Sequence, residues 1–424
     1  MKNVLFATTA LVALGLVPLA EAQAQDKKPA EKPISIRVGG YFQGQVVFGT
    51  NEDSTRRGVT GGNKIRNYGI GRESEIHFAG ETQLNNGLRV GVQVELEGET
   101  SADQIDNTYL YFQHANWGRV ILGEDWGSGL KVAKGTVGHI TGIGANSHFA
   151  SFGGDQRPGT NFVGGGRLNT IMILDSVNDK LIYDTPRIFG FRGSVSFAPD
   201  DKGRGSALPG GGGATGVGLN TKEDGFANIS NVWTIGADYI NTFGPVGVAF
   251  HAGYQRGYRE DTNNGPTSPN SKDPDSFSLG AEVGMAGFRV GAAWKHINNN
   301  LGAFSAAVAT QRGLANLGPT GANSFLGDRD DFTVGVDYTF GPWIVGATYG
   351  FARQEGVPTR VNNRSTDRLD QVTVGAAYTL GPGIALFGGY IWNEFDGKSG
   401  TGATQPKSGD NTAHLFLLGT RLTF

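Results

Sequence analysis

The residues that could carry out chemistry are sparse and form no recognisable catalytic pattern. The chain has seven histidines and no cysteine, and the histidines show no ligand spacing with carboxylates on one element. His139, Ser147, His148 and Asp155 share one stretch and could suggest a hydrolytic trio, but no nucleophile motif surrounds the serine. We therefore expect no catalysis, no cofactor and no metal site.

Two further stretches have a plainer explanation than ligand binding. The glycine run 210–213 is not followed by Lys-Ser or Lys-Thr, which favours a flexible external loop over a phosphate cradle. Asp261, Asp273 and Asp275 could hold a divalent ion, but they lack the spacing of an EF-hand. A solvated polar loop is the favoured interpretation.

Most charged side chains instead alternate with apolar ones, which is the two-residue period of a strand. In the cleanest case, 88–97, Leu88, Val90 and Val92 face one way while Arg89 and Glu95 face the other. Such a strand could cover a soluble core or line a water-filled barrel. The whole pattern has to decide between these two structures.

The spacing of turns and loops favours the barrel. Short turns recur at Asn86-Gly87, Trp117-Gly118, Phe189-Gly190, Gly244-Pro245, Ala286-Gly287, Gly341-Pro342 and Gly381-Pro382. Longer polar loops lie near 49–67, 98–105, 127–179, 199–230, 259–275, 298–330, 353–368 and 394–411. Seven short turns alternating with eight long loops define about sixteen strands with both termini at the short-turn rim. This asymmetry is typical of outer-membrane barrels.

The ends and the composition agree with an exported membrane barrel. Residues 1–24 have the charged start, apolar core and Ala-x-Ala site of a cleaved signal peptide, which leaves 25–424 as the mature chain. The net charge of −3 gives no field that would attract nucleic acid. Outside the signal, no apolar run reaches the roughly 20 residues of a membrane helix. A closed barrel, in which every backbone group pairs between strands, is the remaining way to cross a bilayer.

Aromatic residues and the carboxy-terminal strand add to this prediction. Tyr239, Tyr338, Phe340, Trp343 and Tyr378 precede or follow short turns, where aromatic side chains suit a membrane interface. The last strand, 412–424, ends on an aromatic residue and would have an unprotected edge in a soluble protein. In a barrel it pairs with the first strand.

These residues resemble the general bacterial porins, the trimeric sixteen-stranded channels of Gram-negative outer membranes. The matching motifs are WGRVILGED from Trp117, LIYDTP at Leu181 to Pro186, and the terminal Phe424. The resemblance implies a multi-pass barrel in contact with outer-membrane lipid and lipopolysaccharide, a homotrimer, and recognition of the last strand by the outer-membrane assembly machinery. It also implies that Gly127 to about Asn178 folds into the pore as a constriction loop.

The predicted function is passive diffusion of small hydrophilic solutes through a water-filled pore; the alternative is a channel specific for a sugar or an anion. The expected pore-lining bases of the wall are Arg37, Arg89, Arg119, Arg192, Arg289, Lys295 and Arg421. The expected acids are Glu75, Glu81, Glu95, Glu97, Asp184, Asp238, Glu282 and Asp337.

The basic and acidic side chains expected on the wall are nearly equal in number, so we expect the charges of the long loop to determine the ion preference. Such porins often carry arginines on the wall opposite an acidic loop, but here Glu75 and His77 stand on the wall, and Ile182 replaces a common basic residue. The loop has Lys131, Lys134 and Arg157 against Asp155 between 127 and 166. The usual arrangement is weakened or inverted, and these cations predict a bias toward anions.

Overall fold

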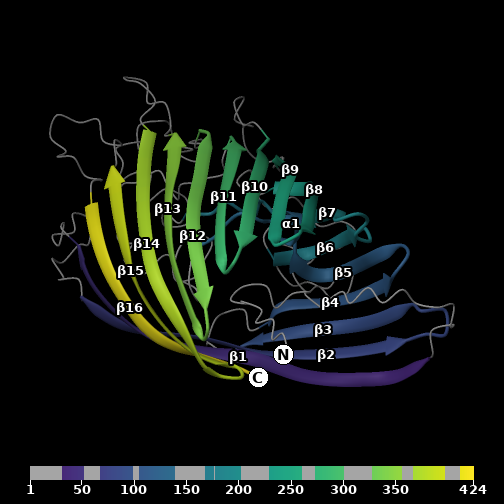
Figure 1. The fold of residues 1–424 in the computed structure, drawn as a ribbon. Coiled ribbons are helices and arrows are strands. Elements are labelled where there is room, and N and C mark those ends of the chain that lie inside the picture. Colours follow the sequence, from purple (N-terminus) through teal and green to yellow (C-terminus); the bar gives the residue numbers. More distant parts are fainter. Residues whose placement is uncertain are drawn as a thin grey trace.

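The chain folds into a closed antiparallel barrel. The computed structural model describes residues 31–51, 67–98, 105–138, 168–175, 177–201, 229–259, 273–299, 327–355, 366–396 and 411–424. Within these ranges sixteen strands each pair with their neighbours in sequence, and β1 pairs with β16 (Figure 1). The predicted antiparallel barrel of sixteen strands is confirmed.

The strands are long at the carboxy-terminal side of the barrel and shorter around β3 to β7. Their bounds are β1 Lys32–Asn51, β2 Tyr68–Gln83, β3 Arg89–Glu97, β4 Ile105–His114, β5 Gly118–Trp126, β6 Val177–Asp184, β7 Phe191–Asp200, β8 Ile229–Phe243, β9 Val246–Arg259, β10 Asp275–Met285, β11 Phe288–Asn298, β12 Arg329–Phe340, β13 Trp343–Glu355, β14 Thr366–Gly381, β15 Ile384–Asp396 and β16 Asn411–Thr423.

Tight turns join the strands at one rim, at all seven predicted positions. Each turn contains a glycine with positive φ, such as Gly87 at 86° and Gly287 at 87°. A side chain is disfavoured in this backbone region, so glycine is the residue that allows the hairpin to close. The stretches predicted as long loops lie mostly outside the described residues.

The two faces of the wall differ in chemistry, as the alternation predicts. On β3, Val92 is 47% exposed on the outer face, whereas Glu95 on the inner face is 3% exposed. The same alternation on β8 exposes Trp233 and Ile235 and buries Thr234. An apolar outer face and a polar inner face are what a barrel in a bilayer requires.

The first and last strands close the barrel in a continuous register from Tyr41↔Thr423 to Asn51↔Ala413. The backbone N–H of Phe424 donates to the carbonyl of Gly40 at 3.1 Å, and the N–H of Gly40 donates to the carbonyl of Phe424 at 3.0 Å. The terminal residue is therefore tied into the wall, and the free edge expected of a soluble sheet is absent from the described strands.

Aromatic side chains gather beside the short turns. Tyr338 stacks on Phe288 with ring centroids 4.2 Å apart, and Trp343 meets Tyr378 at 4.7 Å. Tyr239 lies between Phe191 and Phe250 at the corresponding level of β7 to β9. The predicted gathering of aromatic side chains at this rim is confirmed.

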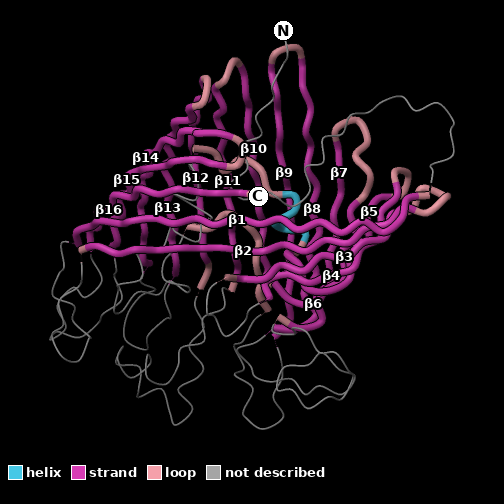
Figure 2. The backbone as a smooth tube through the Cα atoms, turned by 90° about the horizontal axis from the view of Figure 1, so that it is seen from below, coloured by secondary structure: helices cyan, strands magenta, loops and turns pink. Residues whose placement is uncertain are grey.

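One helical turn, α1 (Ser128–Val132), follows β5 and lies beside β8 and β9 (Figure 2). No helix among the described residues has the length and apolar character needed to span a membrane.

Candidate functional site: charged clusters on the inner face of the barrel

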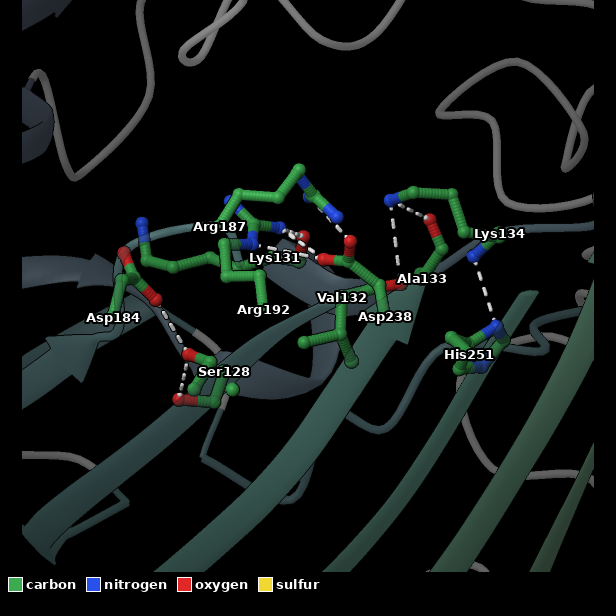
Figure 3. Close-up of polar contacts among 12 residues, drawn as sticks. Ser128, Lys131, Val132, Ala133, Lys134, Asp184, Arg187, Arg192, Asp238 and His251 are labelled. Carbon is green, nitrogen blue, oxygen red and sulfur yellow. Dashed lines mark hydrogen bonds and ion pairs between the residues drawn. The ribbon is translucent and has the colours of Figure 1, made fainter. Parts of the chain in front are cut away.

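The segment after β5 lies on the inner face of the barrel. The backbone N–H of Ser128 donates to Ser196 Oγ of β7 at 3.1 Å. That of Lys134 donates to His251 Nδ1 of β9 at 2.9 Å (Figure 3). Further on, Thr348 Oγ1 of β13 donates to the carbonyl of Val137 at 2.8 Å. A stretch of ten residues that touches strands from β7 to β13 can do so only from inside the barrel.

Small wall residues allow this close approach. A Cβ built on Gly280 of β10 would stand 2.1 Å from the carbonyl oxygen of Lys134, and one on Gly335 of β12 would stand 1.9 Å from that of Val137. Any side chain at either position would push the segment off the wall. Residues 134–138 therefore lie directly against the backbone of these wall glycines.

The far end of the same segment is also attached to the inner face. The N–H of Asn169 donates to Asp331 Oδ1 at 3.1 Å, and Ser278 Oγ donates to the carbonyl of Thr170 at 2.9 Å. Thr170 Oγ1 lies 3.0 Å from Thr136 Oγ1, so the two ends meet. Residues 139–167, with the predicted Asp155 and Arg157 and the trio His139, Ser147 and His148, lie outside the described residues.

Asp238 of β8 is the centre of a basic cluster beside α1. Its side chain has no exposed surface and lies between Arg187 and Arg192. Arg192 donates to Asp238 Oδ2 through Nη2 at 2.6 Å and Nε at 2.9 Å, and Arg187 Nη2 bonds Oδ1. One carboxylate therefore serves two guanidinium groups, which leaves this cluster net positive (Figure 3).

The two predicted loop lysines have different surroundings. Lys131 Nζ is 2.7 Å from Asp125 Oδ2, whose side chain is fully buried, so its charge is balanced. Lys134 Nζ donates to the carbonyls of Val132 and Ala133 at 3.3 and 3.0 Å. Within the described part of the chain Lys134 forms no ion pair, and its charge adds to that of the cluster around Asp238.

An acidic cluster occupies β2 and β3. Glu75 and His77 lie on the inner face of β2, and their pairing partners on β3 are Glu97 and Glu95. His77 Nε2 is 2.6 Å from Glu75 Oε2, and Tyr41 of β1 donates to the other Glu75 oxygen at 2.7 Å. The structure thus brings together three predicted pore-lining acids and a histidine.

The other predicted wall residues are spread around the barrel. Arg119 lies over the ring of Tyr111, 4.3 Å from its centroid, and Arg289 pairs with Asp337 at 2.8 Å. Arg37 and Arg89 lie near the short-turn rim, opposite Ala79 and Gln83 of β2.

Lys295 was predicted to line the pore, but it does not border open space. It is 2% exposed and 3.4 Å from the buried Asp331, because Asn169 and its neighbours cover this part of the wall.

Two features of the site were missed by sequence reasoning. Arg187 was overlooked because it stands in the turn after β6 rather than on a strand. The gathering of His77 with Glu95 is not visible on either strand alone, because the two residues lie on different strands. The short turn at Asn86-Gly87 carried the necessary signal, since the register that pairs Gln83 with Arg89 also pairs His77 with Glu95.

Comparison with known families decides the identity of the barrel. The family of Gram-negative porins matches residues 7–398. The chain belongs to the Gram-negative porins. This porin is therefore an outer-membrane channel, and its family and fold point to a channel rather than an enzyme.

Solved porin structures share the fold at low sequence identity. The outer-membrane channel DcaP of Acinetobacter baumannii has a TM-score of 0.56 and 12% identity, and the alignment covers 92% of this chain and 97% of the DcaP chain. The anion-selective porin from Comamonas acidovorans has a TM-score of 0.53 and 14% identity, with 92% and 100% covered. A trimer form of OmpT from Vibrio cholerae gives 0.52 and 16%, with 92% and 100% covered. No curated protein sequence matches the chain.

Proposed function

We propose that this porin allows small hydrophilic solutes and ions to diffuse passively across the outer membrane. The observation that carries the proposal is the contrast between the faces of the wall, with polar and charged side chains inside and apolar ones outside. Both described ends of the segment after β5 lie within the barrel. A segment held in this way narrows the path, and a narrowed polar path sieves solutes by size and charge.

Ion preference follows from two clusters of opposite sign. Arg187 and Arg192 share the carboxylate of Asp238 beside α1, and Lys134 lies close to them (Figure 3). The acids Glu75, Glu95 and Glu97 lie on β2 and β3. The basic cluster is attached to the narrowing segment, where protein walls confine the field and water screens least. We infer a preference for anions, as in the anion-selective porin from Comamonas acidovorans.

The unpaired charge of Lys134 provides the test of this preference. At about 8 Å and an effective dielectric constant of about 40, one unit charge changes the energy of a passing ion by about 1 kcal/mol, which is about sixfold in the local concentration of that ion before screening. Salt reduces this effect. Lys134→Gln should shift the reversal potential in a potassium chloride gradient toward cations by about twofold to fivefold in the permeability ratio.

A matched substitution separates this effect from a general loss of positive charge. Lys32→Gln removes the same charge at the start of β1, away from the segment, and should leave the reversal potential unchanged. Equal reversal potentials for the wild type and Lys134→Gln would contradict the placement of the selective charge.

The assembly also belongs to the proposal. We infer a signal peptide over residues 1–24, a mature barrel over 25–424 and a homotrimer, which the trimer form of Vibrio OmpT supports by analogy. The apolar outer face would contact lipid and lipopolysaccharide, and the last strand would be recognised by the assembly machinery. A heat-stable band at three times the mass of the chain on a gel of outer-membrane extract is expected; a single-chain band without heating would contradict the trimer.

A further inference from the structure

The acidic cluster on β2 and β3 has the composition of a metal site. We propose that Glu75, His77 and Glu95 bind a divalent transition-metal ion, with Zn²⁺ as the representative ion. One ligand atom from each side chain, an imidazole nitrogen and two carboxylate oxygens, lies within 4.8 Å of the other two. The site is separate from the basic cluster beside α1.

The hairpin between β2 and β3 sets the arrangement of these ligands. Glu75 and His77 are two residues apart on one strand and share its inner face, and Glu95 is directly paired with His77 across the ladder. Directly opposed residues of an antiparallel pair have Cβ atoms about 5 Å apart. Three ligands on such a frame approach an ion from one side, which leaves the remaining positions to water from the interior.

The distances suit a small ion after a slight adjustment. Zn²⁺ binds nitrogen and oxygen at about 2.1 Å, so two tetrahedral ligands stand about 3.4 Å apart. His77 Nε2 and Glu75 Oε2 are now 2.6 Å apart, joined by a hydrogen bond. A cation would take the position of the shared proton, and the two side chains would separate by less than about 1 Å.

Neighbouring side chains already orient the carboxylates. Tyr41 donates to Glu75 Oε1 at 2.7 Å, Asn107 Nδ2 donates to Glu95 Oε2 at 2.5 Å, and Gln93 donates to Glu95 Oε1. Hydrogen bonds of this kind hold metal ligands in place and contribute to affinity.

Asn107 places a buried oxygen beside the cluster. The residue is 1% exposed, and its Oδ1 is a buried oxygen without a hydrogen-bond partner. Its Nδ2 faces Glu95, and half a turn of the amide would bring Oδ1 to that side. There Oδ1 would be a further oxygen ligand for a bound cation, whose charge would offset the repulsion between Oδ1 and the Glu95 carboxylate.

The ligand set selects the class of ion. One imidazole nitrogen with carboxylate oxygens suits Zn²⁺ and its neighbours in the first transition row, whereas Mg²⁺ and Ca²⁺ prefer oxygen alone. Bound Zn²⁺ would add two positive charges to the acidic side of the interior. Its binding would therefore also strengthen anion preference, although binding itself does not depend on conduction.

Calorimetric titration of the refolded full chain in detergent with zinc chloride tests the proposal. We expect one ion per chain with micromolar affinity, and at least a tenfold weaker affinity in both His77→Gln and Glu95→Gln. His114→Gln is the matched control, because His114 lies at the short-turn rim and stacks on Trp117. It should bind as the wild type does.

Several results would overturn the proposal. No heat of binding in the wild type up to millimolar zinc would do so, as would equal affinity in the wild type and His77→Gln, which would place any zinc elsewhere in the chain. The migration of each unheated variant on a gel verifies that the barrel is folded. Reversal potentials of Glu95→Gln with and without zinc then report on selectivity separately, so failure of the channel proposal would not be mistaken for failure of this one.

Discussion

Asp238 is predicted to stabilise the inner wall more than Asp337, another carboxylate that pairs with an arginine across two strands. Its side chain is fully buried, and it accepts hydrogen bonds from both Arg187 and Arg192. Asp238→Asn keeps the shape but removes the charge and replaces one acceptor oxygen with a donor. One of the two guanidinium groups would then face an amide N–H instead of an oxygen.

The cost can be bounded from the burial of the partners. Losing one partner of a fully buried pair costs about 3–5 kcal/mol, and a net hydrogen bond to a charged group is worth about 1.5–3 kcal/mol. The guanidinium side chains of Arg187 and Arg192 are 20% and 27% exposed, so water relieves part of the penalty. We expect Asp238→Asn to lower the free energy of unfolding by about 2–4 kcal/mol.

Asp337 provides the matched control, because it is also paired across two strands with an arginine. It has a single guanidinium partner, Arg289, whose side chain is 39% exposed. Asp337→Asn should cost about 1 kcal/mol, as more exposed pairs do. Urea titrations of both variants in lipid vesicles, followed by tryptophan fluorescence, measure the difference. Equal losses would refute the argument that burial and the shared carboxylate set the cost.

Three further predictions concern the outer face of β3, the terminal residue that closes the barrel, and Lys134 in the segment after β5. Val92→Arg places a charge on the outer face and should lower the free energy of unfolding by about 2–4 kcal/mol if residue 92 lies near the bilayer midplane. The same urea titration measures this loss. No change in the free energy of unfolding would mean that residue 92 faces the interior, and that the assigned faces of β3 are reversed. Deleting Phe424 removes the two backbone hydrogen bonds to Gly40 and should reduce the heat-stable trimer in outer-membrane fractions, whereas an unchanged yield at normal expression would speak against the role of this residue. Burial lowers the pKa of Lys134, so its charge is lost at lower pH than for an ordinary lysine, and anion preference should decline between pH 7 and 10 more in the wild type than in Lys134→Gln. Parallel pH profiles of the two reversal potentials would contradict this.

The fold could be predicted because its determinants are local. The alternation of Val92 with Glu95, and a glycine in each short turn, fix the faces and the hairpins within a few residues of sequence. Pairing of β1 with β16 could be predicted because an apolar terminal strand needs a partner.

The site could be predicted only in part because its contacts are distant in sequence. That Asp125 balances the charge of Lys131, while no carboxylate pairs with Lys134 among the described residues, depends on how the eight residues after β5 turn within the barrel. The contact of Lys134 with His251 spans 117 positions, and no periodicity reports such a separation. The gathering of His77 with Glu95 was within reach, because one short turn determines it.

Single-channel recording of the purified porin in planar bilayers tests the central claim most directly. If the polar inner face surrounds a water-filled path, the protein should produce discrete conductance steps that rise nearly in proportion to salt concentration, with a reversal potential that favours anions. Absence of steps in a preparation that migrates as a folded barrel, or a conductance that saturates at low salt, would contradict an open diffusion channel.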